Sequence, residues 1–484
     1  TLTTILVFEN AKMFSITEGC ITTSPFNQRT SSSILFKALN KLFEVFSGEK
    51  PGSGVAYKNK TLKKDIINQI DLNGDMTIAD LAKELSISTP KITNLVNELI
   101  EDGILQDEGK IDSTGGRRAN IYGLGSDACY FVGVDVKRFG INIGLLDFKK
   151  HLVKVQENVP YIMENTQESL NNLIKCIKSF IEEQKLGLNK ILGIGINLSG
   201  RVNHLIGYSY SFFHFNEESL SETIEKALGV RTFLENDSRA MAYGEFCSGV
   251  VNNEKNILFV NLDYGTGLGM IVDGRLYYGK SGFSGEFGHI PFFNNEIICQ
   301  CGKKGCLETE VSGLALIRMV KEKLKSGSSS NLLKKGKKID DIKLEDIVAA
   351  ALNEDMLVIE LLEEFSEKLG RALAVLINLI NPELVILGGT ISKTGDYIKL
   401  PARTALNKYS LSLVNSDTQF KLTKLGERAG VDDTGILDAA HAFRVQRQQR
   451  TDRCAGIAQL FIGIVLDHEY GWHLPDRGEV HGFV

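Results

Sequence analysis

Apolar side chains recur at helical spacing three times between residues 60 and 124. The inward-facing sets are Leu62, Ile66, Ile67 and Ile70, then Leu81, Ala82 and Leu85, then Ile92, Leu95, Val96 and Leu99. Each set follows the period that places apolar side chains on one face of a helix. Two short strands follow, at 104–106 and 120–122, with a polar tip between them. This order predicts a winged helix-turn-helix domain over residues 57–125.

Turn and cap residues delimit the three predicted helices. Asn73-Gly74 ends the first helix. Thr77 caps the second, and we expect no capping box there because Glu84 lies too far along the helix. Pro90 suits the first turn of the third helix, and Gly103 ends it.

In a domain of this kind the third helix enters the major groove, and the wing reaches the neighbouring backbone or minor groove. The candidate DNA contacts are Ser88, Thr89, Lys91, Thr93, Asn94 and Asn97 on that helix, with Arg117 and Arg118 after Gly115-Gly116 at the tip of the wing. Short polar groups suit base edges and phosphates. Residues 58–124 hold 9 basic and 11 acidic side chains, so a module that binds another protein is the alternative.

Strands and helices alternate from residue 129 onward. We expect strands at 130–136, 141–147, 152–159 and 191–198, a helix at 168–184, and a second strand pair at 256–263 and 268–272. A strand that ends in aspartate, a tight turn and a returning strand occur twice, at Asp135 and at Asp263. This duplication predicts an α/β fold of two lobes with a cleft between them, over residues 129–445.

The two ends of the chain, residues 1–56 and 446–484, carry no pattern that assigns them to a fold. The longest apolar run, 455–466, spans 12 positions and is too short to cross a bilayer. Residues 1–14 lack the basic start and the sustained apolar stretch of a secretory signal. We therefore expect a cytoplasmic protein that does not bind membranes.

Composition narrows the class of protein. Apolar residues make up 43% and charged residues 24% of 484, which excludes wholesale disorder, collagen and a coiled-coil rod. The formal net charge of −5 provides no overall positive field, so binding to nucleic acid would depend on a local module.

Four side chains between residues 289 and 306 predict a metal site. They are His289, Cys299, Cys301 and Cys306. One imidazole and three thiolates match tetrahedral zinc, and four protein ligands leave no open position, which indicates a structural ion. Free thiols in a reducing compartment are the alternative.

Carboxylates lie on both sides of this loop and at one strand end. In Glu235-Asn236-Asp237, a carboxylate can take a proton from a substrate hydroxyl, although Asn and Asp are also preferred helix N-caps. Glu286 and Glu308 flank the metal loop and suit the hydroxyls of a polyol; surface acids are the alternative. His289 can bind metal through one nitrogen and donate from the other.

Two glycine-rich segments are candidates for nucleotide binding. Gly265-Thr266-Gly267 lies between two predicted strands and is expected to be a hairpin turn that offers backbone N–H groups to phosphate. Gly388-Gly389 follows an apolar strand. It is either a platform for a nucleotide base or a turn between a strand and a helix.

Together these motifs resemble the ROK family (repressors, open reading frames and sugar kinases). The resemblance spans roughly residues 58–445 and is carried by Glu286-x-x-His289, Cys301-Gly302-x-x-Gly305-Cys306-Leu307-Glu308, Glu235-Asn236-Asp237 and Asn381-Pro382 before Gly388-Gly389. It implies the actin-like, ribonuclease-H-like ATPase fold. It also implies Asp237 as the base that activates a sugar hydroxyl, and Asn236, Glu286, His289 and Glu308 as sugar contacts. The winged helix resembles the repressor branch of the family.

The chain departs from the family's kinases where ATP phosphates would lie. Kinases carry Asp-x-Gly-Gly-Thr in the first strand pair, but here the sequence is Asp135-Val136-Lys137-Arg138-Phe139. Side chains replace the glycines that let phosphates approach the backbone, and the second phosphate turn is shortened. Both turns are thus altered while the sugar-contacting set is intact.

The sequence therefore predicts a sugar-responsive transcriptional repressor rather than an enzyme. We expect a homodimer or a dimer of dimers that binds a palindromic operator, with a sugar or phosphosugar as effector and zinc as a structural ion. The alternative is an ATP- and magnesium-dependent hexose or N-acetylhexosamine kinase with an accessory DNA-binding domain.

Overall fold

The computed structural model describes residues 5–9, 12–17, 20–25, 54–110, 119–215, 217–333 and 337–426. Two compact units are distinguished, one of residues 1–65 with 458–484 and one of residues 66–457. Among the described helices, none is long and apolar enough to cross a membrane.

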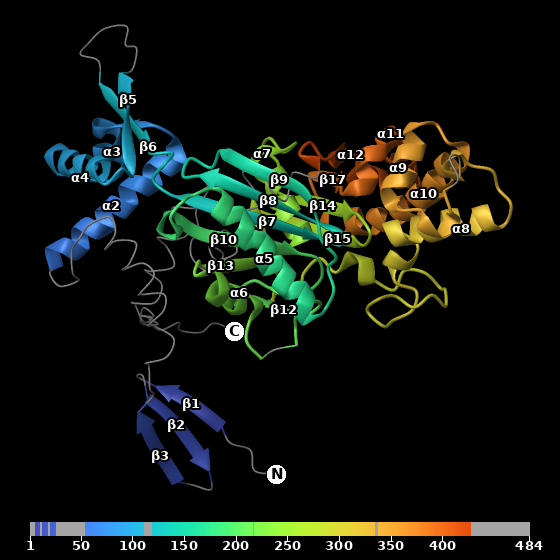
Figure 1. Ribbon diagram of the computed structural model, residues 1–484, viewed down its shortest axis with the longest axis horizontal. Coiled ribbons are helices and arrows are strands. Elements are labelled where there is room, and N and C mark those ends of the chain that lie inside the picture. Colours follow the sequence, from blue (N-terminus) through green and yellow to red (C-terminus); the bar gives the residue numbers. More distant parts are fainter. Residues whose placement is uncertain are drawn as a thin grey trace, which may run out of the picture. The chain divides into compact units, whose positions relative to one another are not determined.

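The start of the chain, for which the sequence offered no pattern, contains three strands. β1 (Ile5–Glu9), β2 (Lys12–Thr17) and β3 (Cys20–Pro25) pair antiparallel in that order (Figure 1). Helix α2 (Gly54–Asn73) begins several residues before the position that the apolar pattern predicts, and it ends at the expected asparagine.

The winged helix-turn-helix is present in the second unit. It contains α3 (Ile78–Glu84), α4 (Thr89–Glu101), β4 (Met76–Thr77), β5 (Leu105–Lys110) and β6 (Asn120–Leu124), with the strands in the order β4-β6-β5. The predicted inward faces are buried at Ile66, Ile67, Ile70, Leu81, Ile92, Leu95, Val96 and Leu99. β4 was not predicted, because two residues are too few to show a strand period.

One expectation about this domain is wrong: the second helix does have a capping box. Asp80, not Glu84, completes it, since the Asp80 N–H donates to Thr77 Oγ1 at 3.1 Å and the Thr77 N–H donates back to Asp80 Oδ2 at 3.4 Å. An aspartate at the third helical position can make the reciprocal bond that is usually made by glutamate.

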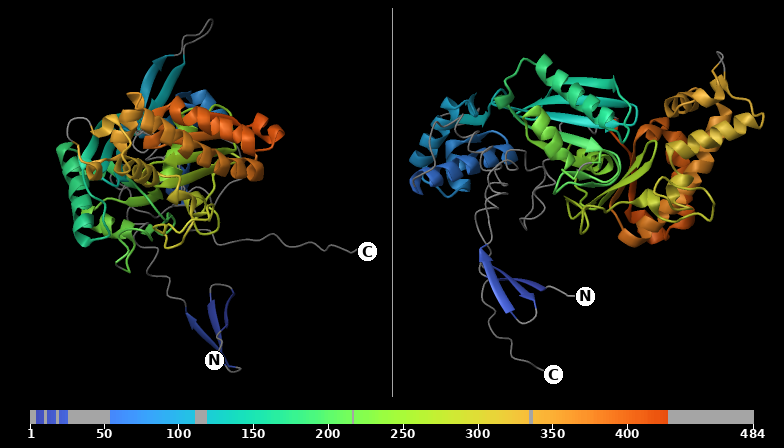
Figure 2. Two further views of the ribbon diagram at one scale, coloured as in Figure 1. Left: turned by 90° about the vertical axis from the view of Figure 1, so that its right-hand side faces the viewer. Right: turned by 60° about the horizontal axis from the view of Figure 1, so that its bottom comes forward.

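The first lobe of the larger domain is built on a five-stranded sheet. Its order is β13-β10-β7-β8-β9, with β7 (Tyr130–Lys137), β8 (Gly140–Asp147), β9 (Leu152–Pro160), β10 (Ile191–Leu198) and β13 (Thr232–Asn236). Helices α5 (Gln167–Glu183) and α6 (Leu220–Leu228) contribute their apolar faces to one core with these strands. Figure 2 shows the ribbons of this lobe, coloured teal to green, from two further sides. A short hairpin, β11 (Val202–Asn203) and β12 (Tyr208–Ser209), lies between β10 and α6 in the chain.

The second lobe repeats the arrangement. Its sheet order is β16-β15-β14-β17-β18, with β14 (Ile257–Leu262), β15 (Thr266–Val272), β16 (Arg275–Leu276), β17 (Leu384–Gly388) and β18 (Gln419–Leu422). Five helices belong to this lobe: α8 (Gly313–Lys325), α9 (Leu344–Leu352), α10 (Met356–Ile380), α11 (Asp396–Tyr409) and α12 (Ser412–Asp417). Helix α10 ends at Asn381, which has a left-handed φ of 49° before Pro382.

Helix α7 (Asp237–Ser248) connects the two lobes. It continues from β13 of the first sheet, and its apolar side chains Ala242, Tyr243 and Phe246 pack against β14 and β15 of the second. Its first turn therefore lies where the lobes meet. The two-lobed α/β prediction is confirmed.

Candidate functional site

Asn236 and Asp237 lie where strand β13 turns into helix α7. Asn236 is the N-cap of the helix, and its Oδ1 accepts a hydrogen bond of 3.1 Å from the Arg239 N–H. Its amide Nδ2 donates to the Gly200 carbonyl at 3.0 Å and so holds the loop after β10. Asn236 is therefore the residue that caps the helix. Asp237 is the first residue of the helix, and its carboxylate is not used as the cap.

Four groups donate to the Asp237 carboxylate, the fourth being Ser238 Oγ, which donates to Oδ1 at 3.1 Å. Oδ2 accepts from Ser199 Oγ at 2.7 Å, while Oδ1 accepts from the Ser238 N–H at 2.7 Å and from Asn236 Nδ2 at 2.9 Å. Burial raises the pKa of Asp237, these hydrogen bonds oppose the shift, and the charge of Asp263 adds to it. The carboxylate is thus oriented by its neighbours and more basic than an exposed aspartate.

A buried ion pair beneath this strand end was not singled out from the sequence. Arg239 Nη2 lies 2.7 Å from Glu235 Oε1, and both side chains are almost fully buried. Tyr278 donates its hydroxyl to Glu235 Oε2 at 3.1 Å, and Arg239 also donates to the carbonyls of Gly282 and Val202. In the sequence, only the spacing of four residues between Glu235 and Arg239 could have indicated this ion pair. The cluster fixes three chain segments around Asp237.

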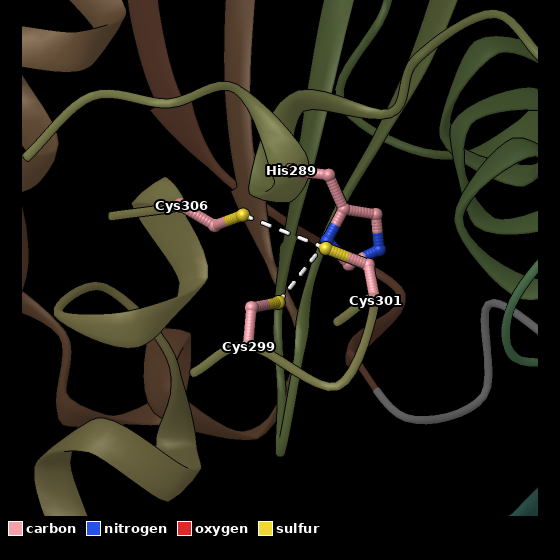
Figure 3. Close-up of side chains that lie close together, drawn as sticks. All are labelled: His289, Cys299, Cys301 and Cys306. Carbon is pink, nitrogen blue, oxygen red and sulfur yellow. Dashed lines mark hydrogen bonds between the residues drawn. The ribbon is translucent and has the colours of Figure 1, made fainter. Parts of the chain in front are cut away.

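The four predicted metal ligands converge. His289, Cys299, Cys301 and Cys306 each offer a donor atom, and these atoms all lie within 4.8 Å of one another (Figure 3). His289 Nδ1 lies 3.5 Å from Cys299 Sγ, and Cys301 Sγ lies 3.6 Å from Cys306 Sγ. Donor atoms of this type at this spacing can surround one ion.

The glutamates predicted to contact sugar lie beside this cluster. Glu286 Oε2 is 3.8 Å from His289 Nε2, the ring nitrogen that faces away from the cysteines. Burial raises the pKa of Glu286, the positive charges of His289, Arg201 and Arg239 oppose the shift, and Asp237 adds to it. Glu286 therefore shares one electrostatic environment with Asp237.

Glu308 has a second role that the sequence did not reveal. Its Oε2 accepts a hydrogen bond of 3.1 Å from the Thr266 N–H, and its Oε1 lies 3.7 Å from Cys299 Sγ. The carboxylate thus joins the cysteine loop to the start of β15. The Thr266 N–H, one of the groups expected to face phosphate, is already paired.

The expected glycine-rich hairpin turn is wrong in extent. The turn holds only Asp263, Tyr264 and Gly265, because Thr266 and Gly267 already belong to β15. A Cβ on Gly267 would lie 2.0 Å from Ser238 Oγ. This glycine therefore allows α7 to approach the strand.

Gly388-Gly389 is similarly explained by packing. A Cβ on Gly388 would lie 2.2 Å from the Phe259 ring, and a Cβ on Gly389, whose φ is 80°, would lie 2.5 Å from the Leu262 carbonyl. Both glycines are needed for the close approach of β14 and β17 at this edge.

The altered turn of the first lobe meets the turn of the second. Phe139, between β7 and β8, packs edge-to-face on Tyr264, with ring centroids 5.2 Å apart and an interplanar angle of 75°. The Arg138 guanidinium lies over the Phe139 ring at 5.6 Å. Asp135 is buried, and Lys137 Nζ lies 3.9 Å from its Oδ2. Bulky and charged side chains thus occupy both turns.

The predicted DNA-contacting face of α4 is mostly accessible. Ser88, Thr89, Asn94 and Asn97 are exposed, and Lys91 and Thr93 are half-buried. Thr93 Oγ1 donates to the Thr89 carbonyl at 2.8 Å. Arg117 and Arg118 lie outside the described residues.

Fold and site define a class of protein: a two-lobed domain of the sugar-kinase type joined to a winged helix. The chain belongs to the ROK family, whose model matches residues 131–468, and a winged helix-turn-helix DNA-binding model matches residues 60–106.

Curated relatives include transcriptional regulators. The chain is 28% identical over 399 residues to "DNA-binding transcriptional dual regulator NagC" of Escherichia coli K12, covering 81% of this chain and 96% of that protein. It is 28% identical over 376 residues to the xylose repressor of Bacillus subtilis 168, covering 77% and 93%.

Two solved structures have the same fold. A ROK family transcriptional regulator described as a homolog of the E. coli Mlc protein matches with a TM-score of 0.67 and 25% identity, covering 85% of this chain and all of that one. A ROK family glucokinase from Streptomyces griseus in complex with glucose and AMPPNP matches with a TM-score of 0.55 and 25% identity, covering 63% and 97%.

Proposed function

We propose that this protein is a sugar-responsive transcriptional repressor, which binds a palindromic operator through its winged helix and a small sugar or phosphosugar in its ROK domain. One observation carries the proposal. The carboxylates of Asp237 and Glu286 interact electrostatically at the lobe boundary, while Phe139 packs on Tyr264 between the two turns to which the family resemblance assigns a nucleotide's phosphates.

The sugar contacts in this proposal are Asn236, Asp237, Glu286, His289 and Glu308. Their carboxylates and imidazole offer acceptors and donors to several hydroxyls, and the Glu235–Arg239 pair keeps the strand end in place. We include zinc as the ion that His289, Cys299, Cys301 and Cys306 would hold. Bound there, it would make the 289–306 loop rigid and fix the orientation of the His289 ring.

The kinase alternative has one observation in its favour, the oriented Asp237 carboxylate, whose pKa is raised by burial. Phosphoryl transfer depends on positioning and charge stabilisation at the phosphates. Here the Thr266 N–H is bonded to Glu308, and Asp135 faces Lys137. Residues Asp135, Gly265, Gly267, Gly388 and Gly389 are therefore better explained by packing and internal pairing than by ATP and magnesium.

A coupled ADP-release assay over a panel of hexoses and N-acetylhexosamines distinguishes the two functions. We expect no turnover above background. Turnover of about 10 s⁻¹ or more, which is typical of an enzyme, would establish the kinase and contradict the proposal.

In the DNA-binding state, α4 would lie in the major groove, with Ser88, Thr89, Lys91, Thr93 and Asn94 facing bases and phosphates. Arg117 and Arg118 would act at the wing. Selection of genomic fragments, followed by affinity measured against salt concentration, tests this role. A steep loss of affinity with salt is expected because phosphate contacts release counterions, and no retained fragment would favour the protein-binding alternative.

Homodimerisation is part of the proposal, since a palindromic site requires two winged helices. Exposed leucines on adjacent helices of the second lobe offer an apolar surface for it: Leu379 on α10, Leu400 on α11, and Leu411 and Leu413 at α12. We place the domain boundaries at 57–125 and 129–445, and we expect the protein in the cytoplasm, where an operator would be available.

A signal can pass from the ROK domain to the DNA-binding domain through the β8–β9 turn. Lys149 Nζ pairs with Glu108 of β5, and Lys150 Nζ lies 2.6 Å from Asp71 Oδ1 of α2. The same strand, β8, starts directly after Phe139 at the lobe boundary. A movement of the lobes on sugar binding would thus reach the winged helix through a rigid, fully buried strand.

A further inference from the structure

Three aromatic side chains form an accessible cluster beside the β11–β12 hairpin. Tyr208 and Tyr210 have ring centroids 4.9 Å apart, and Tyr210 meets Phe283 edge-to-face at 5.3 Å. Tyr210 is 41% exposed and Phe283 38%. An exposed cluster of large rings needs an explanation, since single exposed apolar residues are common but grouped ones usually mark a binding surface.

The hairpin register places Tyr210 next to the proposed sugar contacts. Val202 pairs with Ser209, and the Tyr210 N–H donates to the Arg201 carbonyl at 2.8 Å, which extends the ladder by one pair. Opposite residues of an antiparallel pair point to the same face, so Tyr210 shares a face with Arg201, whose charge acts on Glu286. The residue before Arg201 is Gly200, whose carbonyl accepts from Asn236.

Phe283 approaches from a second chain segment that also leads to the site. Its neighbour Gly282 is held by Arg239 through a hydrogen bond of 2.9 Å, and Glu286 follows three residues after Phe283. The segments that carry the rings are therefore both tied to residues around Asp237: the hairpin through the Gly200 carbonyl, which accepts from Asn236, and the Phe283 segment through the Gly282 carbonyl, which accepts from Arg239. The cluster adjoins the proposed sugar site.

We propose that Tyr210, Phe283 and Tyr208 form a second subsite, which binds the next pyranose ring of a disaccharide or glycoside whose first ring occupies the site at Asp237. A pyranose presents a face of C–H groups that packs on aromatic rings, while its hydroxyls remain in water. Aromatic side chains offer this apolar area with little loss of conformational freedom. The inference rests on the proposed function, because it assumes that the Asp237 site binds sugar.

Calorimetric titration of the full-length protein tests the subsite. The probes are three pairs, each made of a monosaccharide and the disaccharide built from it. They are N-acetylglucosamine with N,N′-diacetylchitobiose, xylose with xylobiose, and glucose with cellobiose. For the pair that binds, we expect the disaccharide to bind about tenfold more tightly, corresponding to about 1.4 kcal/mol. Tyr210→Ala and Phe283→Ala should each remove most of that ratio and leave the affinity for the monosaccharide unchanged.

Two further variants separate binding from folding. Tyr210→Trp keeps a stacking ring and should retain the ratio. Tyr409→Ala, on α11, removes an aromatic side chain of similar exposure (39%) outside the cluster and should not alter it.

The other outcomes overturn the inference. Equal affinity for mono- and disaccharide, or a ratio that survives both alanine variants, means that the rings only pack the hairpin, and the proposed function stands. If no probe of either kind binds the wild-type protein, the Asp237 site is not a site for these sugars and the subsite fails; the proposed function is then decided by the titration with phosphosugars.

Discussion

Asp237 lies at the first turn of a helix, accepts four hydrogen bonds and has a raised pKa. The hydrogen bonds stabilise the ionised carboxylate, but the raised pKa shows that burial disfavours its charge more strongly. A carboxyl whose pKa is higher in the folded than in the unfolded protein makes the folded state less stable once pH rises above the unfolded value. A half-buried carboxylate that lowers stability in this way is typical of a functional position.

Replacing Asp237 by asparagine should therefore separate function from stability. Asp237→Asn keeps the size and an oxygen that can accept from the Ser238 N–H, but it removes the charge. We expect at least about a tenfold loss in sugar affinity, as for the loss of a charged hydrogen bond. The melting temperature at pH 7 should equal or exceed that of the wild type. Calorimetry and thermal unfolding measure both, and a large fall in melting temperature would show that the carboxylate is structural.

The cysteine cluster makes a second residue-scale prediction. Cys301→Ser should lower the melting temperature by about 5 °C or more and weaken sugar binding, since a bound ion would hold the 289–306 loop that Glu286 and Glu308 flank. Cys247→Ser, a partly buried cysteine of α7 outside the cluster, is the matched control. Elemental analysis should find about one zinc per chain in the wild type and control; equal melting temperatures for all three proteins would exclude a structural ion.

At the scale of elements, strand β8 lies between two contacts that join different parts of the second unit. Phe139 meets Tyr264 just before the strand starts, and Lys149 and Lys150 pair with Glu108 and Asp71 just after it ends. All eight residues of the strand are buried, so neighbouring elements cover it along its whole length. The ion pair of Lys150 matters most, because the Asp71 side chain is only 2% exposed.

Removing these ion pairs should uncouple sugar binding from DNA binding. For Lys149→Ala/Lys150→Ala we expect unchanged sugar affinity and an operator affinity that changes at least about threefold less on sugar addition than in the wild type. Lys154→Ala, an exposed lysine of β9, is the control. Full retention of the sugar effect in the double variant would mean that the signal takes another route.

Helix α4 supports a further prediction at this scale. Asn94 is exposed in the middle of the helix, and asparagine pairs best with adenine in the major groove. Asn94→Ala should weaken binding to a selected operator about tenfold and leave sugar affinity unchanged. Glu98→Ala, exposed one turn further along, should not weaken it. Equal operator affinity for wild type and Asn94→Ala would show that α4 does not read bases.

The sequence predicted features that depend on local spacing. The three helices of the winged domain and the convergence of His289 with Cys299, Cys301 and Cys306 follow from periods and spacings of a few residues. What it missed depends on contacts between distant segments. Gly267 was interpreted as a phosphate-facing turn because Ser238, which fills the space beside it, comes from another helix. The Phe139–Tyr264 and Lys150–Asp71 contacts likewise join residues that no local pattern relates.

At the scale of the whole molecule, the second unit combines a DNA-binding domain with a sugar-kinase fold in which Phe139 and Tyr264 pack together at the two strand turns. The family match over residues 131–468 and the winged helix match over 60–106 agree with this division. A ligand changes operator affinity only if it binds the two conformations of the protein unequally. The proposed combination of sugar contacts with altered phosphate turns suits such a sensor, since its effector must be bound and released unchanged.

The most direct test of this account is the affinity of the purified protein for its selected operator, measured at constant salt across a titration with each sugar and phosphosugar of a panel. We predict that at least one ligand changes the dissociation constant by about tenfold or more and that Asp237→Asn abolishes the change. An operator affinity that stays constant at saturating concentrations of every ligand would contradict the account.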